Sequence, residues 1–217
     1  MTEALFYPTE TSDSYVGRHG QTQTFADIRA GAGTFSSVSN AALVAELLTH
    51  GSVSDRWQQF TRAVVNFNTA GLPDDAIISA VTLSVCVTSI INARADSISL
   101  VATTASDPSS IVTADYAQFG TTLLSDTEHA IAGLTVDSST MTVWTLNSTG
   151  RAATKVDAYT QLGVRTKRDV DNSPATWGAG EVDRVIFQSA DTGLAADKRP
   201  TLTVTYSLPF PPRVIMF

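Results

Sequence analysis

The side chains used most often in catalysis and metal binding are scattered along this chain. The histidines, His19, His50 and His129, occupy unrelated polar or turn contexts, and none has a partner at the spacing of a zinc site. The sequence contains no Gly-x-Ser-x-Gly elbow and no phosphate-binding glycine loop. Asp74 and Asp75 are adjacent, but they lie in a turn-forming stretch. The sequence neither predicts nor excludes a pair of catalytic carboxylates like that of a glycosidase, because the two residues of such a pair come together only in the folded protein. The sequence predicts no catalytic residue, no cofactor and no enzyme.

One short segment carries oxygen ligands close together. Asp169, Asp171 and Asn172 have the Asp-x-Asp-Asn spacing of a calcium-binding loop. Calcium takes about six to eight oxygen ligands, and neither the glycine nor the glutamate of an EF-hand follows. We therefore favour a solvent-exposed turn and predict no metal site, with these three residues as weak calcium candidates.

Aromatic side chains could bind a ligand, because a sugar ring can pack on their flat apolar faces. Trp57 and Trp144 lie within alternating apolar runs and are expected in the core. Tyr116 is a further candidate. Trp177 lies in the loop-forming stretch Pro-Ala-Thr-Trp-Gly, so it is the better candidate for a glycan-binding residue.

The C-terminal segment 207–217, Ser-Leu-Pro-Phe-Pro-Pro-Arg-Val-Ile-Met-Phe, is apolar and rich in proline. An exposed apolar tail is a liability in a free monomer, so it either packs on its own domain or docks on a neighbouring subunit. Its prolines hold it extended, which reduces the entropy lost on docking. The residues predicted to contact a partner are Pro209, Phe210, Pro211, Pro212, Val214, Ile215, Met216 and Phe217.

The net charge of −7, from 14 basic and 21 acidic residues, argues against a nucleic-acid partner. No apolar run approaches the roughly 18 residues of a membrane span, so no membrane partner is expected. The N-terminus lacks the basic and apolar regions of a secretory signal. Cys86 lies in an apolar run and is expected to pack in the core.

Alternating apolar residues recur along the chain, most clearly between Arg62 and Val87. We predict about eight to ten short strands in an all-β, antiparallel jelly-roll β-sandwich with one or two short helices. One domain is expected over residues 1–206, followed by the tail. Residues 25–31 and 131–134 are expected as strands. Residues 41–48 favour a helix, with an edge strand as the alternative, and residues 150–159 favour a second helix capped by Ser148 or Thr149.

Four segments, in this order along the chain, resemble those of a known family. They are Asp-Ser-Tyr-Val at 13–16, Asp-Ile-Arg-Ala-Gly at 27–31, the run 62–83, and Arg-Pro-Thr-Leu-Thr-Val-Thr-Tyr at 199–206. Together they resemble the DNRLRE-type jelly-roll β-sandwiches, relatives of carbohydrate-binding modules that occur in surface proteins and phage structural proteins. The inserted segment 35–55 and the run 144–147 depart from that pattern. The resemblance implies a fold and no shared catalytic site.

Two functions follow as hypotheses. The first is a non-enzymatic structural protein of a phage-like virion, such as a capsid decoration, spike or tail-associated module. It would form homo-oligomers and bind other virion or capsid subunits, and it would be made in the host cytoplasm without a signal peptide. The alternative is a carbohydrate-binding module that attaches to a cell-surface glycan.

Overall fold

A computed structural model describes residues 1–9, 11–37, 42–136, 140–190 and 196–209. Every strand pair in these ranges is antiparallel, and the helices are short. The predicted all-β, antiparallel sandwich is confirmed, and its open form is consistent with a jelly roll. No helix in the described ranges is both long and apolar enough to cross a membrane.

The strands are β1 (Thr2–Phe6), β2 (Asp13–Gln23), β3 (Phe35–Ser37), β4 (Ala42–Thr49), β5 (Trp57–Asn68), β6 (Ile77–Asn92), β7 (Ser97–Thr103), β8 (Phe119–Leu123), β9 (His129–Ala130), β10 (Met141–Thr145), β11 (Tyr159–Thr166), β12 (Val182–Gln188) and β13 (Thr201–Ser207). The helices are α1 (Phe25–Ala30), α2 (Ser148–Ala153) and α3 (Lys167–Asp171), with 3-10 turns η1 (Thr113–Gln118), η2 (Ile131–Gly133) and η3 (Ala196–Lys198).

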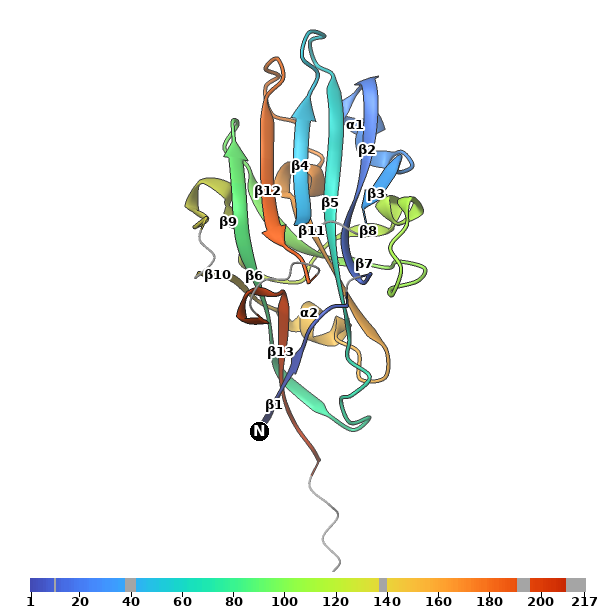
Figure 1. Cartoon of the computed structure of the whole chain (residues 1–217), viewed down its shortest axis with the longest axis vertical. Coiled ribbons are helices and arrows are strands. Elements are labelled where there is room, and N and C mark those ends of the chain that lie inside the picture. The colour runs from blue at the N-terminus through green and yellow to red at the C-terminus, as the bar shows by residue number, and fades with distance from the viewer. Residues whose placement is uncertain (10, 38–41, 137–139, 191–195, 210–217) are drawn as a thin grey trace, which may run out of the picture.

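Strands β5 and β6 each change partner along their length, β6 from β13 to β12. The strand order is β1-β13-β6-β12-β4-β5-β11-β7-β8, and β2 pairs along the other edge of β5. The first half of β5 pairs with β4, whereas its second half pairs with β11. β4 and β11 therefore pair with successive parts of β5, and Figure 1 shows β12, β4, β5 and β2 side by side.

The main core fills the space between the layers. Val65 and Phe67 of β5 pack there, as do Val81, Leu83 and Val85 of β6, all almost fully buried. These are the faces that the alternating pattern predicted. Cys86 is a buried free cysteine, which confirms its expected place in the core.

A second apolar cluster covers the opposite face of β5. Phe25 and Ile28 of α1 pack on Phe60, Val64 and their neighbours. Nearly the whole of β5 is buried because both of its faces are covered. The rings of Phe25 and Phe60 meet edge-to-face at 4.9 Å.

Two segments take the opposite secondary structure to the one expected. Residues 25–30 of the segment expected as a strand form α1, because the Thr24 hydroxyl accepts a hydrogen bond from the amide of Asp27 at 3.1 Å and caps a helical turn. Residues 42–49 form strand β4 and not a helix. β4 pairs with β5 and β12 on its two sides, so it is also not the edge strand of the alternative.

Smaller differences lie elsewhere. Residues 131–133 form a 3-10 turn where a strand was expected. The helix expected over 150–159 is α2, which begins at Ser148 and ends at Ala153. Its cap is Asn147, whose side-chain oxygen accepts the amide of Gly150 at 2.9 Å.

Candidate functional site

The structure places three of the aromatic candidates in the core. Trp57 is 4% exposed and Trp144 is fully buried, which confirms the expectation for both. Tyr116 is also fully buried, and its hydroxyl donates to the main-chain oxygen of Ile28 at 2.8 Å. None of these rings is therefore open to a sugar.

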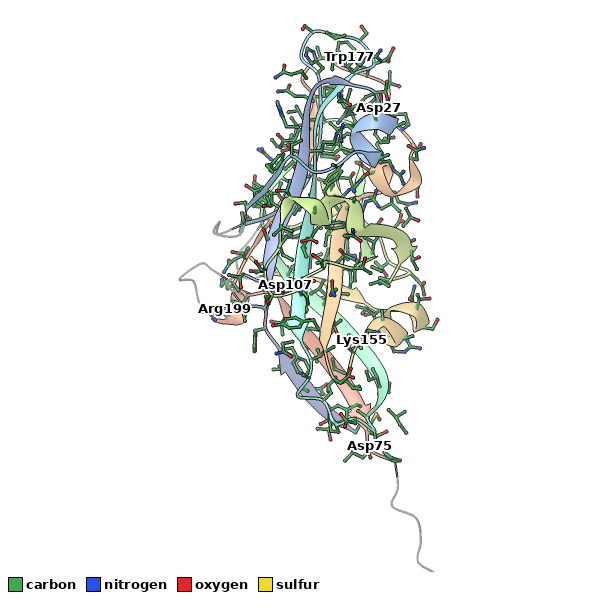
Figure 2. The ribbon with its side chains drawn as sticks, turned by 90° about the vertical axis from the view of Figure 1, so that its right-hand side faces the viewer. Asp27, Asp75, Asp107, Lys155, Trp177 and Arg199 are labelled. Atoms are coloured by element: carbon green, nitrogen blue, oxygen red, sulfur yellow. The ribbon has the colours of Figure 1, made fainter. Side chains whose placement is uncertain are left out.

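Trp177 lies half-buried in the loop before β12, at one end of the long axis of the molecule (Figure 2). Its indole N–H donates to the main-chain oxygen of Arg56 at 3.2 Å. It lines a shallow depression of about 510 Å³ with Arg94, Arg168 and Glu181. Arg94 pairs at 2.9 Å with a buried carboxylate, that of Asp183. Trp177 therefore remains a candidate for a glycan-binding residue, although its indole N–H is already hydrogen-bonded to the main chain.

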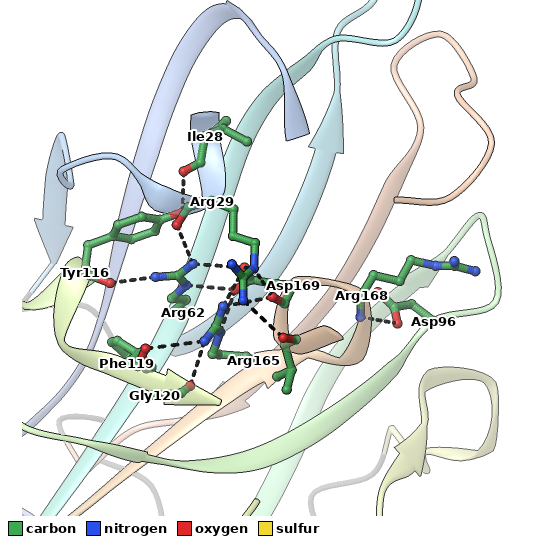
Figure 3. Close-up of polar contacts among 11 residues, drawn as sticks. Ile28, Arg29, Arg62, Asp96, Tyr116, Phe119, Gly120, Arg165, Arg168 and Asp169 are labelled. Atoms are coloured by element: carbon green, nitrogen blue, oxygen red, sulfur yellow. Dashed lines mark hydrogen bonds and ion pairs between the residues drawn. The ribbon is translucent and has the colours of Figure 1, made fainter. Parts of the chain in front are cut away.

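The calcium candidate Asp169 is instead the centre of a cluster of arginines (Figure 3). Its Oδ2 accepts from Nε of Arg62 and Nε of Arg165, both at 2.8 Å. Its Oδ1 accepts from Nη2 of the same two arginines, at 2.9 and 2.8 Å. Because both carboxylate oxygens accept from guanidinium donors, neither oxygen of Asp169 is available to a metal ion.

The other two calcium candidates serve helix α3. Asp171 pairs with Lys167 one turn earlier on the same helix, at an exposed position. Asn172 ends the helix in the left-handed conformation, with φ of 54°. The solvent-exposed turn expected here is instead the short helix α3, and Asp169 within it is buried because it pairs with the arginines. Each of the three residues therefore has a structural role in this segment. The described residues contain no cluster of three or more His, Cys, Asp or Glu side chains that could hold a metal ion.

Of the tail, the structure describes residues 207–209, and Pro209 is exposed. The tail contacts predicted for Phe210, Pro211, Pro212, Val214, Ile215, Met216 and Phe217 lie outside the described residues. The virion-subunit function stays a prediction.

A groove on the outer face of the sandwich gathers residues that the sequence did not single out. It crosses β5 between β2–β3 on one side and β4–β12 on the other, and its volume is about 430 Å³. Residues paired across neighbouring strands point to the same face of a sheet. One such row crosses five strands in register and forms the middle of the groove: Phe35, Gly17, Thr61, Glu46 and Arg184.

The polar part of this groove is held by its own hydrogen bonds. The Gln59 amide donates to Oε1 of Glu46 at 2.8 Å, and Arg184 donates to the other carboxylate oxygen at 3.3 Å. Burial raises the pKa of the Glu46 carboxyl, and the charge of Arg184 partly offsets that shift. Because these side chains stand on paired strands, they are presented in a fixed arrangement.

The aromatic part of the groove depends on Gly17. This glycine lies in the middle of β2. A Cβ atom there would come within 2.1 Å of the Phe35 ring, so only glycine lets the ring lie against the strand. The Phe35 ring meets Tyr15 edge-to-face at 6.3 Å, and both rings are half-buried. The groove therefore combines two partly accessible rings with a preordered set of polar groups.

The sequence carried a weak signal for this groove. Tyr15 lies in the segment 13–16 that resembles the family pattern, and Phe35 opens the segment that departs from it. Neither residue reveals that it lies beside Glu46, because that proximity depends on the register of β3, β2, β5 and β4.

No family model matches the chain, and no curated protein matches it. The resemblance to DNRLRE-type sandwiches therefore stays an expectation. Among solved structures the chain is similar to a protein described as "xylan-binding module CBM15", at 15% identity and a TM-score of 0.37. The similarity covers 94% of this chain and 97% of that one.

Proposed function

We propose that this protein binds a glycan, without hydrolysing it, in the groove that crosses β5. The observation that carries the proposal is the row across five strands, which puts an aromatic pair beside a hydrogen-bonded Gln–Glu–Arg set. A sugar ring offers apolar C–H faces to aromatic rings and hydroxyl groups to amide, carboxylate and guanidinium groups.

The size and build of the groove support this assignment. Its volume of about 430 Å³ lies within the range of small-ligand sites, roughly 300–1,000 Å³. Its apolar walls include Val44 and Ile186, whereas its polar groups lie along Glu46, Gln59 and Arg184. The polar groups are preorganised by the strands, so little side-chain entropy is lost when a ligand binds.

The carboxylates favour binding over hydrolysis. Glycoside hydrolysis generally uses two carboxyl groups on either side of the scissile bond, about 5–9.5 Å apart. Among the described residues that line the groove, Glu46 is the single acidic side chain. Its oxygens are also engaged by Gln59 and Arg184, as expected for a group that orients hydroxyls.

A printed array of plant, fungal and bacterial polysaccharides tests the function, and titration with the best ligand tests the site. Tyr15→Ala and Phe35→Ala are each expected to weaken binding about tenfold, because each removes roughly 1.5 kcal/mol of apolar contact. The matched control is Tyr7→Ala, which removes an aromatic ring that is 47% exposed and lies outside the groove.

Two results would overturn the proposal at different levels. A blank array refutes the glycan-binding function. Binding that survives Tyr15→Ala and Phe35→Ala but is lost in Trp177→Ala moves the site to the depression beside Trp177.

A further inference from the structure

A separate cavity lies beside the arginine cluster of Asp169, at the junction of α1, β5, β8 and β11 (Figure 3). Its volume is about 350 Å³, within the range of small-ligand sites. No acidic side chain is among the described residues that line it. Its charged and hydroxyl-bearing residues are Arg29, Arg62, Arg165 and Thr121.

The cluster behind the cavity is not electrically balanced. Three guanidinium groups surround one carboxylate, that of Asp169, and the side chains of Arg62 and Arg165 are 3% and 2% exposed. Buried charges of this kind are normally paired, because the interior screens them weakly. One carboxylate against three cations leaves a local excess of two positive charges.

The further hydrogen bonds of Arg62 and Arg165 go to neutral main-chain oxygens, which do not cancel this charge. Arg62 donates to the main-chain oxygen of Tyr116 at 2.6 Å and stacks over its ring at 3.9 Å. Arg165 donates to the main-chain oxygen of Gly120 at 2.7 Å. The two buried arginines are thus locked in place as a source of positive potential.

Arg29 is the member of the cluster that keeps free hydrogen-bonding capacity. Its Nε and Nη2 donate to the main-chain oxygens of Asp169 and Val170, at 2.5 and 3.1 Å. Its Nη1 has no hydrogen-bond partner among the described residues, and its side chain is 22% exposed. A guanidinium held at one edge and open at the other is suited to an oxyanion.

Two further hollows lined by arginines within the described part of the chain lack this excess. In the glycan groove Arg184 faces Glu46 at 3.3 Å. In the depression beside Trp177, Arg94 faces Asp183 at 2.9 Å and Glu181 at 4.0 Å. The cavity at Arg29 therefore stands out in a chain whose net charge is −7.

We propose that this cavity binds the oxyanion group, a carboxylate or a phosphate, of a small molecule of about monosaccharide size. Arg29 contacts the anion directly, and Thr121, which bears a hydroxyl, also lines the cavity. Arg62 and Arg165 supply a fixed positive field without moving. The proposal is independent of the glycan groove, because none of its lining residues is shared with that site.

Isothermal titration at constant ionic strength tests the proposal with three probes: inorganic phosphate, glucuronate and the neutral sugar glucose. We expect saturable one-site binding of at least one anion and no binding of glucose. Tighter binding of phosphate identifies a free or esterified phosphate as the ligand class, and tighter binding of glucuronate identifies a carboxylate on a sugar.

Arg29→Gln is expected to weaken anion binding at least tenfold. The matched control Arg151→Gln removes the same charge from a half-buried arginine that also donates to a main-chain oxygen, and it is expected to change affinity less than twofold. Arg29→Lys keeps the charge but loses the planar fork, so it should bind with intermediate affinity. Circular dichroism checks that each variant is folded.

The proposal is overturned if neither anion gives saturable binding to the wild-type protein. It is also overturned if Arg29→Gln and Arg151→Gln weaken binding equally, since that would show a general effect of net charge.

Discussion

Replacing Asp169 by asparagine is the sharpest perturbation of this fold. The substitution keeps the size of the side chain but removes the negative charge that faces Arg62 and Arg165. It also replaces one carboxylate oxygen by an N–H₂ group. In the wild-type protein Oδ2 accepts from Nε of both arginines at 2.8 Å, and Oδ1 accepts from their Nη2 groups at 2.9 and 2.8 Å. Whichever oxygen is replaced, the N–H₂ group therefore faces two guanidinium donors. Breaking a buried ion pair by removing one partner costs about 3–5 kcal/mol, because the remaining charge stays buried and unpaired.

The expected loss is at the upper end of that range, since two almost fully buried arginines lose the same partner. For a chain of this length, each kcal/mol lowers the melting temperature by about 2–4 °C. Asp169→Asn should therefore lower it by roughly 10–20 °C. Urea unfolding followed by tryptophan fluorescence gives the free energy directly.

The pH dependence provides an independent check. Burial alone would raise the pKa of the Asp169 carboxyl, but Arg62 and Arg165 together hold it well below its usual range. A lowered pKa contributes stability at pH values above that of the unfolded group, about 3.9, and this stability is lost as the pH falls further. The wild-type protein should show this loss in acid, and Asp169→Asn should lack it.

The control is Asp171→Asn, two residues along the same helix. Its partner Lys167 is 30% exposed and Asp171 itself is 43% exposed, so the change should cost less than about 1 kcal/mol. A cost for Asp169→Asn no larger than that of the control would refute the reasoning. A melting temperature that rises when calcium is added, but not when magnesium is added, would also refute the reasoning, because it would show that this segment binds calcium.

Three further results are expected. Burial raises the pKa of the Asp96 carboxyl to about 6, so the folded state loses stability as the pH rises from about 4 to about 7. The full loss is about 3 kcal/mol, of which about 2 kcal/mol falls between pH 4.5 and pH 7.5. Asp96→Asn should remove this difference in urea unfolding at those two pH values, and an unchanged difference would contradict the assignment. Gly17→Ala should displace the Phe35 ring and reduce glycan affinity as much as Phe35→Ala, whereas unchanged binding would exclude the ring from the site. If the tail docks on a neighbouring subunit, deleting residues 210–217 should convert an oligomer to a monomer in chromatography with light scattering, and an unchanged mass would contradict the virion-subunit prediction.

The strand pattern could be predicted wherever alternation was long and one face was apolar. The alternation between Arg62 and Val87 predicted strands where β5 and β6 lie, although β6 continues to Asn92. That alternation did not show that β5 is covered on both faces. Segment 25–30 is a helix where a strand was predicted, and segment 42–49 is a strand where a helix was favoured. Six or eight residues carry too little periodicity to separate a helix from a strand, and their neighbours in the fold decide between them.

The candidate sites were less predictable than the strands. Arg165 and Asp169 are four residues apart, but Arg62 lies 107 residues before Asp169. The spacing of Asp169, Asp171 and Asn172 resembled a metal loop because the sequence does not show which cation faces each carboxylate. Phe35 and Arg184 likewise belong to one row only through four successive strand pairings.

The sequence by itself determined the class of fold and the balance of charge. Strands with alternating apolar residues have one apolar face, and that face must pack against a second layer of the fold. An excess of acidic residues disfavours a polyanionic partner such as a nucleic acid. The tertiary structure alone decided which side chains meet: the groove of Tyr15, Phe35 and Glu46, and the excess of positive charge beside Arg29. The physical reason is that both sites depend on strand register and on burial, which arise between segments distant in the chain.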